Sequence, residues 1–345
     1  MVVLRLQWHT MNARLLAILL LVSSSAFAQT PKPKYFDFHN SFWLNLHHTL
    51  FYEASLQALT PEQQKQRGAV PLDSSTLTTP ERNVWEKAVA FYGSRYKNRA
   101  LLFDDELVDL GNALSLQENA KKLKQTSAIP KEVFAVLRHA APIYRKHWWP
   151  AHQHENQLWM ERMVPRVAQF SPKVIPQLEK ILNSPWPGAD RVDVSYFVVA
   201  LGNAYTTTDP GHTTISSGRE ANSGDAGLET IFHEAAHLLT RNLHHQLSQN
   251  CHAENADCGD LWHAIQFFTV GEVVKQQLAS GYEPYAFKYG LYQRGRWSSF
   301  LPLIRKDWQP YMDGKTTFED AIKTLASEIK QEQSNEPARP ASGSR

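Results

Sequence analysis

The residues from 230 to 239 hold two histidines and a glutamate at a spacing that suits metal chemistry. His233, Glu234 and His237 form the pattern H-E-x-x-H in a segment with no other charged residue and no proline. Histidines four positions apart on a helix differ by about 40° around the axis and about 6 Å along it, so both imidazoles can reach one zinc ion. Glu234 follows the first histidine, where its carboxylate can contact a water on the metal, as a general base requires.

The residues around this motif indicate a buried helix that carries both histidines toward a cleft. Ile231, Phe232, Leu238 and Leu239 are apolar, and both variable positions of the motif are alanine. Ser223-Gly224-Asp225 predicts the start of the helix, because serine is a preferred N-cap residue. The alternative is a helix with two hydrogen-bonded histidines and a solvated glutamate, which requires no metal.

Residues 230–239 resemble the extended signature of the zincin metallopeptidases, in which uncharged residues flank and fill the motif. The resemblance is specific over this segment and weaker over residues 192–292. It implies a bound Zn2+ ion, a peptide or protein substrate, and hydrolysis of a peptide bond by water that zinc and Glu234 activate. His233 and His237 are then metal ligands, and Glu234 is the catalytic base.

A catalytic zinc ion also needs a third protein ligand. Metzincins place a glycine three residues and a histidine six residues after the second histidine of the motif. Thr240 and Leu243 occupy those positions here. His244 is one residue late and would lie about 10 Å along a continued helix from His237. The metzincin pattern therefore does not fit this chain.

Gluzincins instead take a glutamate from a later helix, and this resemblance implies Glu272 as the third ligand. Glu272 lies 35 positions after His237 and follows Gly271 in an apolar segment that predicts a helix over 261–278. An unpaired carboxylate is costly in such surroundings. The alternative for Glu272 is an ion pair with Lys275.

His263 lies on the same predicted helix, nine positions before Glu272. Nine positions correspond to about 900°, so the two side chains face opposite sides of a straight helix and cannot bind one metal ion. We therefore expect His263 to be a catalytic group that stabilises the oxyanion. The other candidates for that role are Tyr282, Tyr285, Tyr289 and Tyr292. The reverse assignment, with His263 as the third ligand, stays open.

Two segments before the motif predict strands of a small sheet beside the metal-binding helix. Valines alternate with other residues between 191 and 201, and residues 212–217 are rich in threonine and isoleucine. In zincins a sheet edge beside this helix holds the substrate in extended form, and the resemblance implies that Thr213–Ser217 is that edge. Glu229 lies one turn before His233, where it can complement the helix dipole or hold a substrate amine.

The rest of the chain predicts helices, so the expected fold class is mainly α (α+β), zincin-like, with a small β-sheet beside the metal-binding helix. We expect an N-terminal helical region over residues 29–190 and a catalytic region over 191–332, within one continuous domain, and a disordered tail over 333–345. Predicted helices cover about 38–59, 130–147 and 155–169 and start at Thr60-Pro61, Thr79-Pro80 and Ser171-Pro172.

The first 28 residues are typical of a secretory signal peptide. Arg14 precedes the apolar run 15–22, and Ala26-Phe27-Ala28 forms an A-x-A cleavage site. We expect cleavage after Ala28 and a periplasmic or secreted protein; the alternative is an uncleaved membrane anchor. Cys251 and Cys258 are the two cysteines of the chain. In an exported protein their pairing in a disulfide is favoured, because a thiolate metal site normally needs more ligands.

Composition narrows the possible functions. Of the formal net charge of +2, two positive charges lie in the predicted signal peptide, so the remaining chain is close to neutral. No basic stripe favours nucleic-acid binding, and no later apolar run is long enough for a membrane span. Two alternatives to a peptidase remain: a non-catalytic secreted binding protein on a zincin scaffold, and a zinc hydrolase of non-peptide amides or esters.

Overall fold

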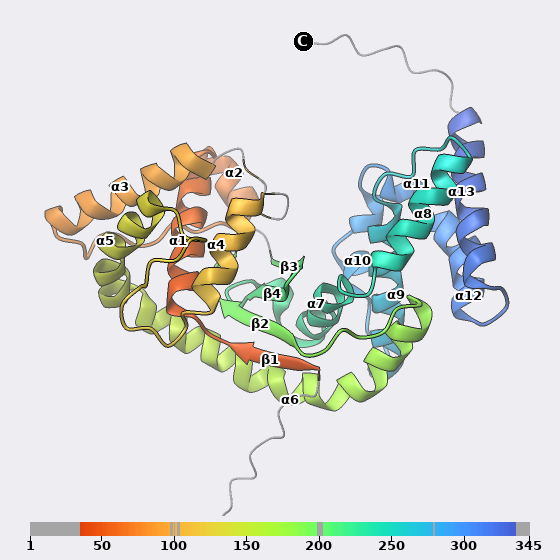
Figure 1. Cartoon of the computed structure of the whole chain (residues 1–345), viewed down its shortest axis with the longest axis horizontal. Coiled ribbons are helices and arrows are strands. Elements are labelled where there is room, and N and C mark those ends of the chain that lie inside the picture. The colour runs from red at the N-terminus through yellow and green to blue at the C-terminus, as the bar shows by residue number, and fades with distance from the viewer. Residues whose placement is uncertain are drawn as a thin grey trace, which may run out of the picture. The chain divides into compact units, whose positions relative to one another are not determined.

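One mixed β-sheet lies between two groups of helices (Figure 1). Its strands follow the order β1-β2-β4-β3, with β1 and β4 parallel to β2 and with β3 antiparallel to β4. The strands are β1 Phe36–His39, β2 Asp190–Ser195, β3 Ala204–Thr208 and β4 Gly211–Ser216. The structure confirms the predicted fold class, which is mainly α with a small β-sheet.

The computed structural model describes residues 35–96, 99, 101, 104–198, 203–278 and 280–335. The predicted signal peptide, residues 1–28, lies outside this range, as do residues 336–345 of the predicted tail. The first three residues of that tail, 333–335, belong to a helix. The described residues fall within one compact unit that begins at Lys32. None of their helices is long and apolar enough to cross a membrane.

The helices before the sheet strand β2 are largely those that the capping pattern predicts. They are α1 Phe42–Gln57, α2 Pro61–Gln66, α3 Thr79–Tyr96, α4 Asp105–Ser115, α5 Lys131–His147 and α6 Trp149–Ile181. Thr60 and Gln63 form a capping box at α2. At α3 the capping hydroxyl belongs to Thr78, one residue before the predicted Thr79, because Thr78 Oγ1 accepts a hydrogen bond from the N–H of Glu81.

α6 continues through Ser171-Pro172, where the sequence predicts a new helix. Three prolines lie inside it, and each removes one backbone donor. A buried stripe that includes Trp159, Met163 and Val167 packs α6 on the helices that follow β4. This tertiary packing outweighs the local signal for a break.

The helices after β4 surround the H-E-x-x-H segment. They are α7 Gly224–Ala236, α8 Arg241–Ala253, α9 Leu261–Gln277, α10 Tyr285–Lys288, α11 Trp297–Leu303, α12 Gln309–Met312 and α13 Phe318–Asn335, with a π-helical segment at Ile304–Trp308. α7 begins after the predicted cap residue Ser223 and packs on β3, β4, α6 and α9. The predicted disulfide between Cys251 and Cys258 is present and joins the end of α8 to the approach of α9.

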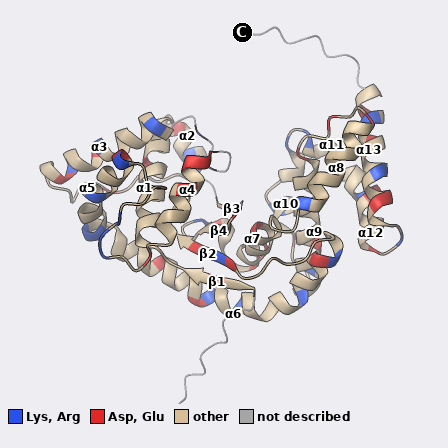
Figure 2. Ribbon diagram, in the orientation of Figure 1, with Lys and Arg blue, Asp and Glu red and all other residues tan. Residues whose placement is uncertain are grey.

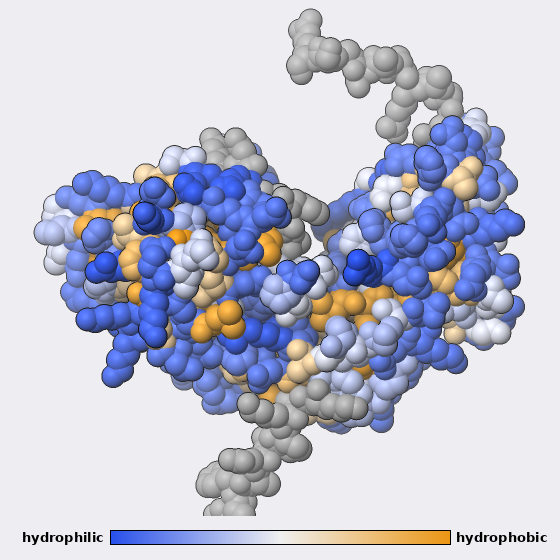
Figure 3. Space-filling view, viewed as in Figure 1, coloured by the Kyte–Doolittle hydropathy of each residue, from blue (hydrophilic) through white to orange (hydrophobic). Residues whose placement is uncertain are grey.

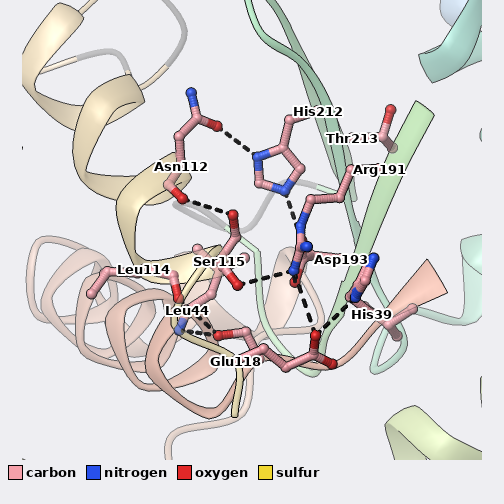
Figure 4. Close-up of polar contacts among 12 residues, drawn as sticks. His39, Leu44, Asn112, Leu114, Ser115, Glu118, Arg191, Asp193, His212 and Thr213 are labelled. Atoms are coloured by element: carbon pink, nitrogen blue, oxygen red, sulfur yellow. Dashed lines mark hydrogen bonds and ion pairs between the residues drawn. The ribbon is translucent and has the colours of Figure 1, made fainter. Parts of the chain in front are cut away.

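Alternation along the strands gives the sheet two different faces. Val192, Val194 and Ile215 face α7 and belong to the core that also holds α6, α9 and α13. The opposite face is polar and contacts α4 (Figure 4). There the Asp193 carboxylate accepts a hydrogen bond from Arg191 Nε at 2.6 Å and lies 2.9 Å from His212 Nε2. Although burial opposes it, hydrogen bonding to His212 and Arg191 holds the pKa of Asp193 below its usual value.

The surface carries both signs of charge. Lysine and arginine are interspersed with aspartate and glutamate along the helices, without a stripe of one sign in this view (Figure 2). Hydrophilic residues cover most of the visible face, and hydrophobic residues show in small separate areas (Figure 3). Most buried apolar side chains belong to two hydrophobic cores, one on either side of the sheet.

Candidate metal centre

Three histidines from two helices meet in one cluster. His233 and His237 come from the C-terminal end of α7, and His263 comes from the first turn of α9. One ring nitrogen from each lies within 4.8 Å of the other two, and the Nε2 atoms of His233 and His263 are 3.2 Å apart. Zn–N bonds of about 2.0–2.1 Å with tetrahedral angles place two ligand nitrogens about 3.3 Å apart. The three residues therefore fit a zinc ion.

Backbone interactions explain why the two helices present these side chains together. α7 ends at Ala236, and His237 keeps helical backbone angles as its C-cap, so it stays one turn from His233. The carbonyl oxygen of His233 accepts a hydrogen bond from Gln266 Nε2 at 2.7 Å. Gln266 lies one turn after His263 on α9. This single bond satisfies a buried side-chain donor and fixes α9 beside the end of α7.

Burial keeps all three imidazoles in the neutral form that metal binding needs. It lowers the pKa of His233 well below the usual value, with further lowering by the other two histidines. Burial also lowers the pKa of His237 to about 3 and that of His263 to about 4. Phe267 stacks on His233 with ring centroids 3.6 Å apart and shields it from water. At neutral pH the nitrogen lone pairs of the three imidazoles are therefore available to bind a cation.

Glu234 lies in the same cleft but outside the histidine cluster. Its Oε2 accepts a hydrogen bond from Thr206 Oγ1 of β3 at 2.9 Å. Burial raises the pKa of Glu234 to about 8, and the nearby carboxyl group of Asp190 adds to the shift. A divalent cation beside the histidines would favour the ionised form and lower this pKa.

The cleft has a volume of about 490 Å³ and a largely apolar lining. Residues 203–206, at the start of β3, form one wall, and the aromatic rings of Trp262, Phe267 and Tyr285 contribute to the remainder. The full lining is Asn203, Ala204, Tyr205, Thr206, Glu229, Thr230, His233, Glu234, His237, Trp262, His263, Phe267, Tyr285 and Leu291.

The structure does not bring Glu272 to the metal cluster, contrary to its prediction as the third ligand. The Glu272 carboxylate lies 3.7 Å from Lys275 Nζ, and its side chain is 23% exposed. The helical spacing correctly separates it from His263, but the cleft lies on the His263 side. Gly271 has another purpose: a Cβ there would lie 2.7 Å from Pro284 Cβ and 3.2 Å from Glu229 Oε1. His263 therefore changes from predicted oxyanion group to candidate ligand.

The edge strand beside the cleft also differs from the prediction. Thr213–Ser217 was expected at the edge, but β4 pairs with β2 on one side and β3 on the other. β3 is the edge strand on this side of the sheet, and it was not among the predicted strands. Its signal is the run Ala204–Thr208, rich in β-branched threonine, followed by Asp209-Pro210 as the two-residue loop of a hairpin. The predicted strand 191–201 ends at Ser195; residues 196–198 are not in a strand, and 199–201 lie outside the described residues.

The tyrosines that were predicted as candidates for stabilising the oxyanion lie in different surroundings. Tyr285 lines the cleft, and its hydroxyl accepts a hydrogen bond from Asn203 Nδ2 at 2.5 Å. Tyr292 is buried and donates to the carbonyl oxygen of Ala264. The Tyr282 hydroxyl and the Tyr285 N–H both donate to Glu229 Oε2, at 2.6 and 2.9 Å. Glu229 is fully buried, and its Oε2 anchors this loop.

Comparison with known proteins adds no assignment. No family model, curated protein or solved structure matches this chain.

Proposed function

We propose that this chain is a zinc-dependent hydrolase that cleaves peptide bonds. The observation that carries the proposal is the placement of His233, His237 and His263 in one buried cluster, with Glu234 in the same cleft. Three neutral imidazoles leave an open coordination position for water or substrate, which is the arrangement of a catalytic rather than a structural zinc site.

When bound, zinc would polarise the carbonyl group of the substrate and lower the pKa of a coordinated water molecule. The Glu234 carboxylate is placed to accept a proton from an attacking water molecule and to pass it to the leaving nitrogen, so it would act first as base and then as acid. Thr206 donates to one Glu234 oxygen and leaves the other available for this transfer.

β3 supplies a place for an extended substrate. It is an edge strand, and its first residues line the cleft that holds Glu234. Backbone groups on a free strand edge can pair with a peptide, and alternate side chains then point into pockets. The apolar lining favours a hydrophobic side chain next to the cleaved bond.

Tyr285 is the candidate for stabilising the oxyanion, in place of the earlier candidate His263. Its hydroxyl lines the cleft and is oriented by Asn203. A hydroxyl that accepts from an amide has its own proton free to donate. Such a donor stabilises the charge that develops on the carbonyl oxygen during attack by water.

Metal analysis of the purified protein combined with a mixed-peptide cleavage profile tests the proposal. We expect about one zinc ion per chain and cleavage of peptides, with Glu234→Gln retaining zinc and losing cleavage. Zinc without cleavage of any peptide would instead indicate a binding protein, and activity on small amides or esters alone would indicate a non-peptide hydrolase. Export to the periplasm or medium is part of the proposal, and the disulfide is compatible with it.

A further inference from the structure

A chain of hydrogen-bonded oxygens runs from Glu234 across one face of the sheet to a second buried carboxyl group, Asp190. Thr206 Oγ1 lies 2.9 Å from Glu234 Oε2 and 2.9 Å from Thr213 Oγ1. Thr213 Oγ1 lies 2.8 Å from Asp190 Oδ2. β3, β4 and β2 thus each contribute one residue, and all four side chains are buried.

The number of protons in this chain follows from its geometry. It contains three oxygen–oxygen contacts, from Asp190 to Thr213, from Thr213 to Thr206 and from Thr206 to Glu234. Each contact needs one hydrogen atom, and the two threonine hydroxyls supply only two. With both carboxyl groups ionised, one contact between buried side chains would join two oxygens without a hydrogen, which is costly. One of the two carboxyl groups must therefore supply the third proton.

The surroundings of the two carboxyl groups differ. Glu234 lines the open cleft, where water can reach its carboxylate. Asp190 Oδ1 has no hydrogen-bond partner, and its neighbour Arg191 points to the other face of the sheet, toward Asp193. An ionised carboxylate is costly without a cation or a full set of donors, whereas a protonated acid leaves only a carbonyl oxygen unpaired.

We propose that Asp190 is a protonated carboxylic acid that donates to Thr213 and thereby makes Thr206 a donor to Glu234. Asp190 is a positioning residue: it fixes the direction of both hydroxyl groups and holds the Glu234 carboxylate in the orientation that proton transfer needs. Burial raises the pKa of both carboxyl groups, to about 7 for Asp190 and about 8 for Glu234, so it favours a proton on the pair, and the unpaired Oδ1 assigns that proton to Asp190. The protonated acid does not depend on any activity; its effect on catalysis rests on the proposed hydrolysis.

Infrared difference spectroscopy tests the protonation state without an activity assay. A protonated carboxyl group has a C=O stretch well separated from the carboxylate bands. We expect zinc-loaded protein at neutral pH to show a component of this band that disappears in Asp190→Asn and persists in Glu234→Gln. Other buried acids, such as Glu229, contribute equally to all three proteins and cancel in the differences. A component that persists in Asp190→Asn and disappears in Glu234→Gln would place the proton on Glu234 and overturn the proposal.

Kinetics tests the positioning role. Asp190→Asn keeps an N–H donor toward Thr213, so kcat should stay within about threefold of the wild type. Thr213→Val removes the hydroxyl that orients Thr206, with little change in shape. If Thr206 then no longer donates to the charged Glu234, kcat should fall roughly tenfold at unchanged KM.

Thr214→Val is the matched control for Thr213→Val, because Thr214 is equally buried on the next position of β4 but faces the opposite side of the sheet. It should leave kcat unchanged. If Asp190→Asn lowered kcat as much as Thr213→Val, the functional form of Asp190 would be the ionised carboxylate, which would contradict the proposal. If the wild type hydrolyses nothing, the proposed function fails, and the infrared result alone decides the state of Asp190.

Discussion

Replacement of His263 by alanine should abolish the zinc binding that we propose, while replacement of Glu272 should not. His263 contributes one of three ring nitrogens that lie within 4.8 Å of one another. The Glu272 carboxylate instead lies 3.7 Å from Lys275 Nζ on the same helix. The two substitutions on α9 therefore distinguish the histidine set from the glutamate set that the sequence favours.

The loss of zinc affinity expected in His263→Ala can be estimated from the effect of milder substitutions near metal sites. Removal of a group that only orients a metal ligand already costs 10–100-fold in affinity, so removal of a ligand should cost at least about 100-fold, or about 2.7 kcal/mol. The dissociation constant for zinc, measured by competition with a chromophoric chelator, gives this value directly. Metal content after dialysis checks it independently.

A second histidine provides the control for lost aromatic packing. His244 contacts the same ring as His263, with its centroid 5.4 Å from that of Trp262, but it is not part of the metal cluster. His244→Ala should bind zinc like the wild type. Retention of zinc by His263→Ala, together with its loss from Glu272→Ala, would refute the assignment and restore the gluzincin ligand set.

Three further predictions concern catalysis, stability and pH. Glu234→Gln should retain zinc and lower peptide hydrolysis by about 10²–10⁴-fold, measured as kcat on a peptide substrate, because it removes the general base but no ligand. Replacement of Cys251 and Cys258 by serine should lower the free energy of unfolding in urea by about 2–3 kcal/mol, the loop-closure value for their separation of seven positions; an unchanged value would show that the bond does not constrain the unfolded chain. Burial raises the pKa of Glu229 from 4.5 to about 7 in the folded protein. Below pH 4.5 the Glu229 carboxyl group is protonated in both the folded and the unfolded protein, whereas between pH 4.5 and about 7 it loses its proton only on unfolding. The free energy of unfolding should therefore fall as pH rises through this window, and Glu229→Gln should reduce the fall; an equal fall in wild type and variant would contradict the assignment.

The sequence predicts the parts of the site that depend on local spacing. The helix of His233 and His237 and the opposite faces of His263 and Glu272 follow from helical periodicity. The start of that helix after Ser223 is also as predicted, although the Ser223 hydroxyl bonds the Glu220 carbonyl and does not cap the helix. The disulfide follows from cysteine count in a chain with a signal-like start.

The choice between His263 and Glu272 depends on which face of α9 meets α7, and no local pattern contains that information. The hydrogen bond from Gln266 to the His233 carbonyl decides it, and it joins residues 33 positions apart. Gly271 lets α7 approach α9, because a Cβ at this position would lie 3.2 Å from Glu229 Oε1 of α7 as well as 2.7 Å from Pro284 Cβ. The role of Asp190 likewise depends on strand order, because its connection to Glu234 crosses β4 and β3.

The order of the strands also has a consequence for how this protein folds. The histidine helices and the β3–β4 hairpin lie within residues 204–277, so their contacts can form among near neighbours in the chain. The pairing of Phe36 with Asp190 joins residues 154 positions apart, from 36 to 190. Closing a loop of that length costs about 4–5 kcal/mol of chain entropy before the pair gains any stability. We therefore expect the helices that carry the three histidines to associate early and the β1–β2 ladder to form late, so that the strand that carries Asp190 acquires its last neighbour near the end of folding.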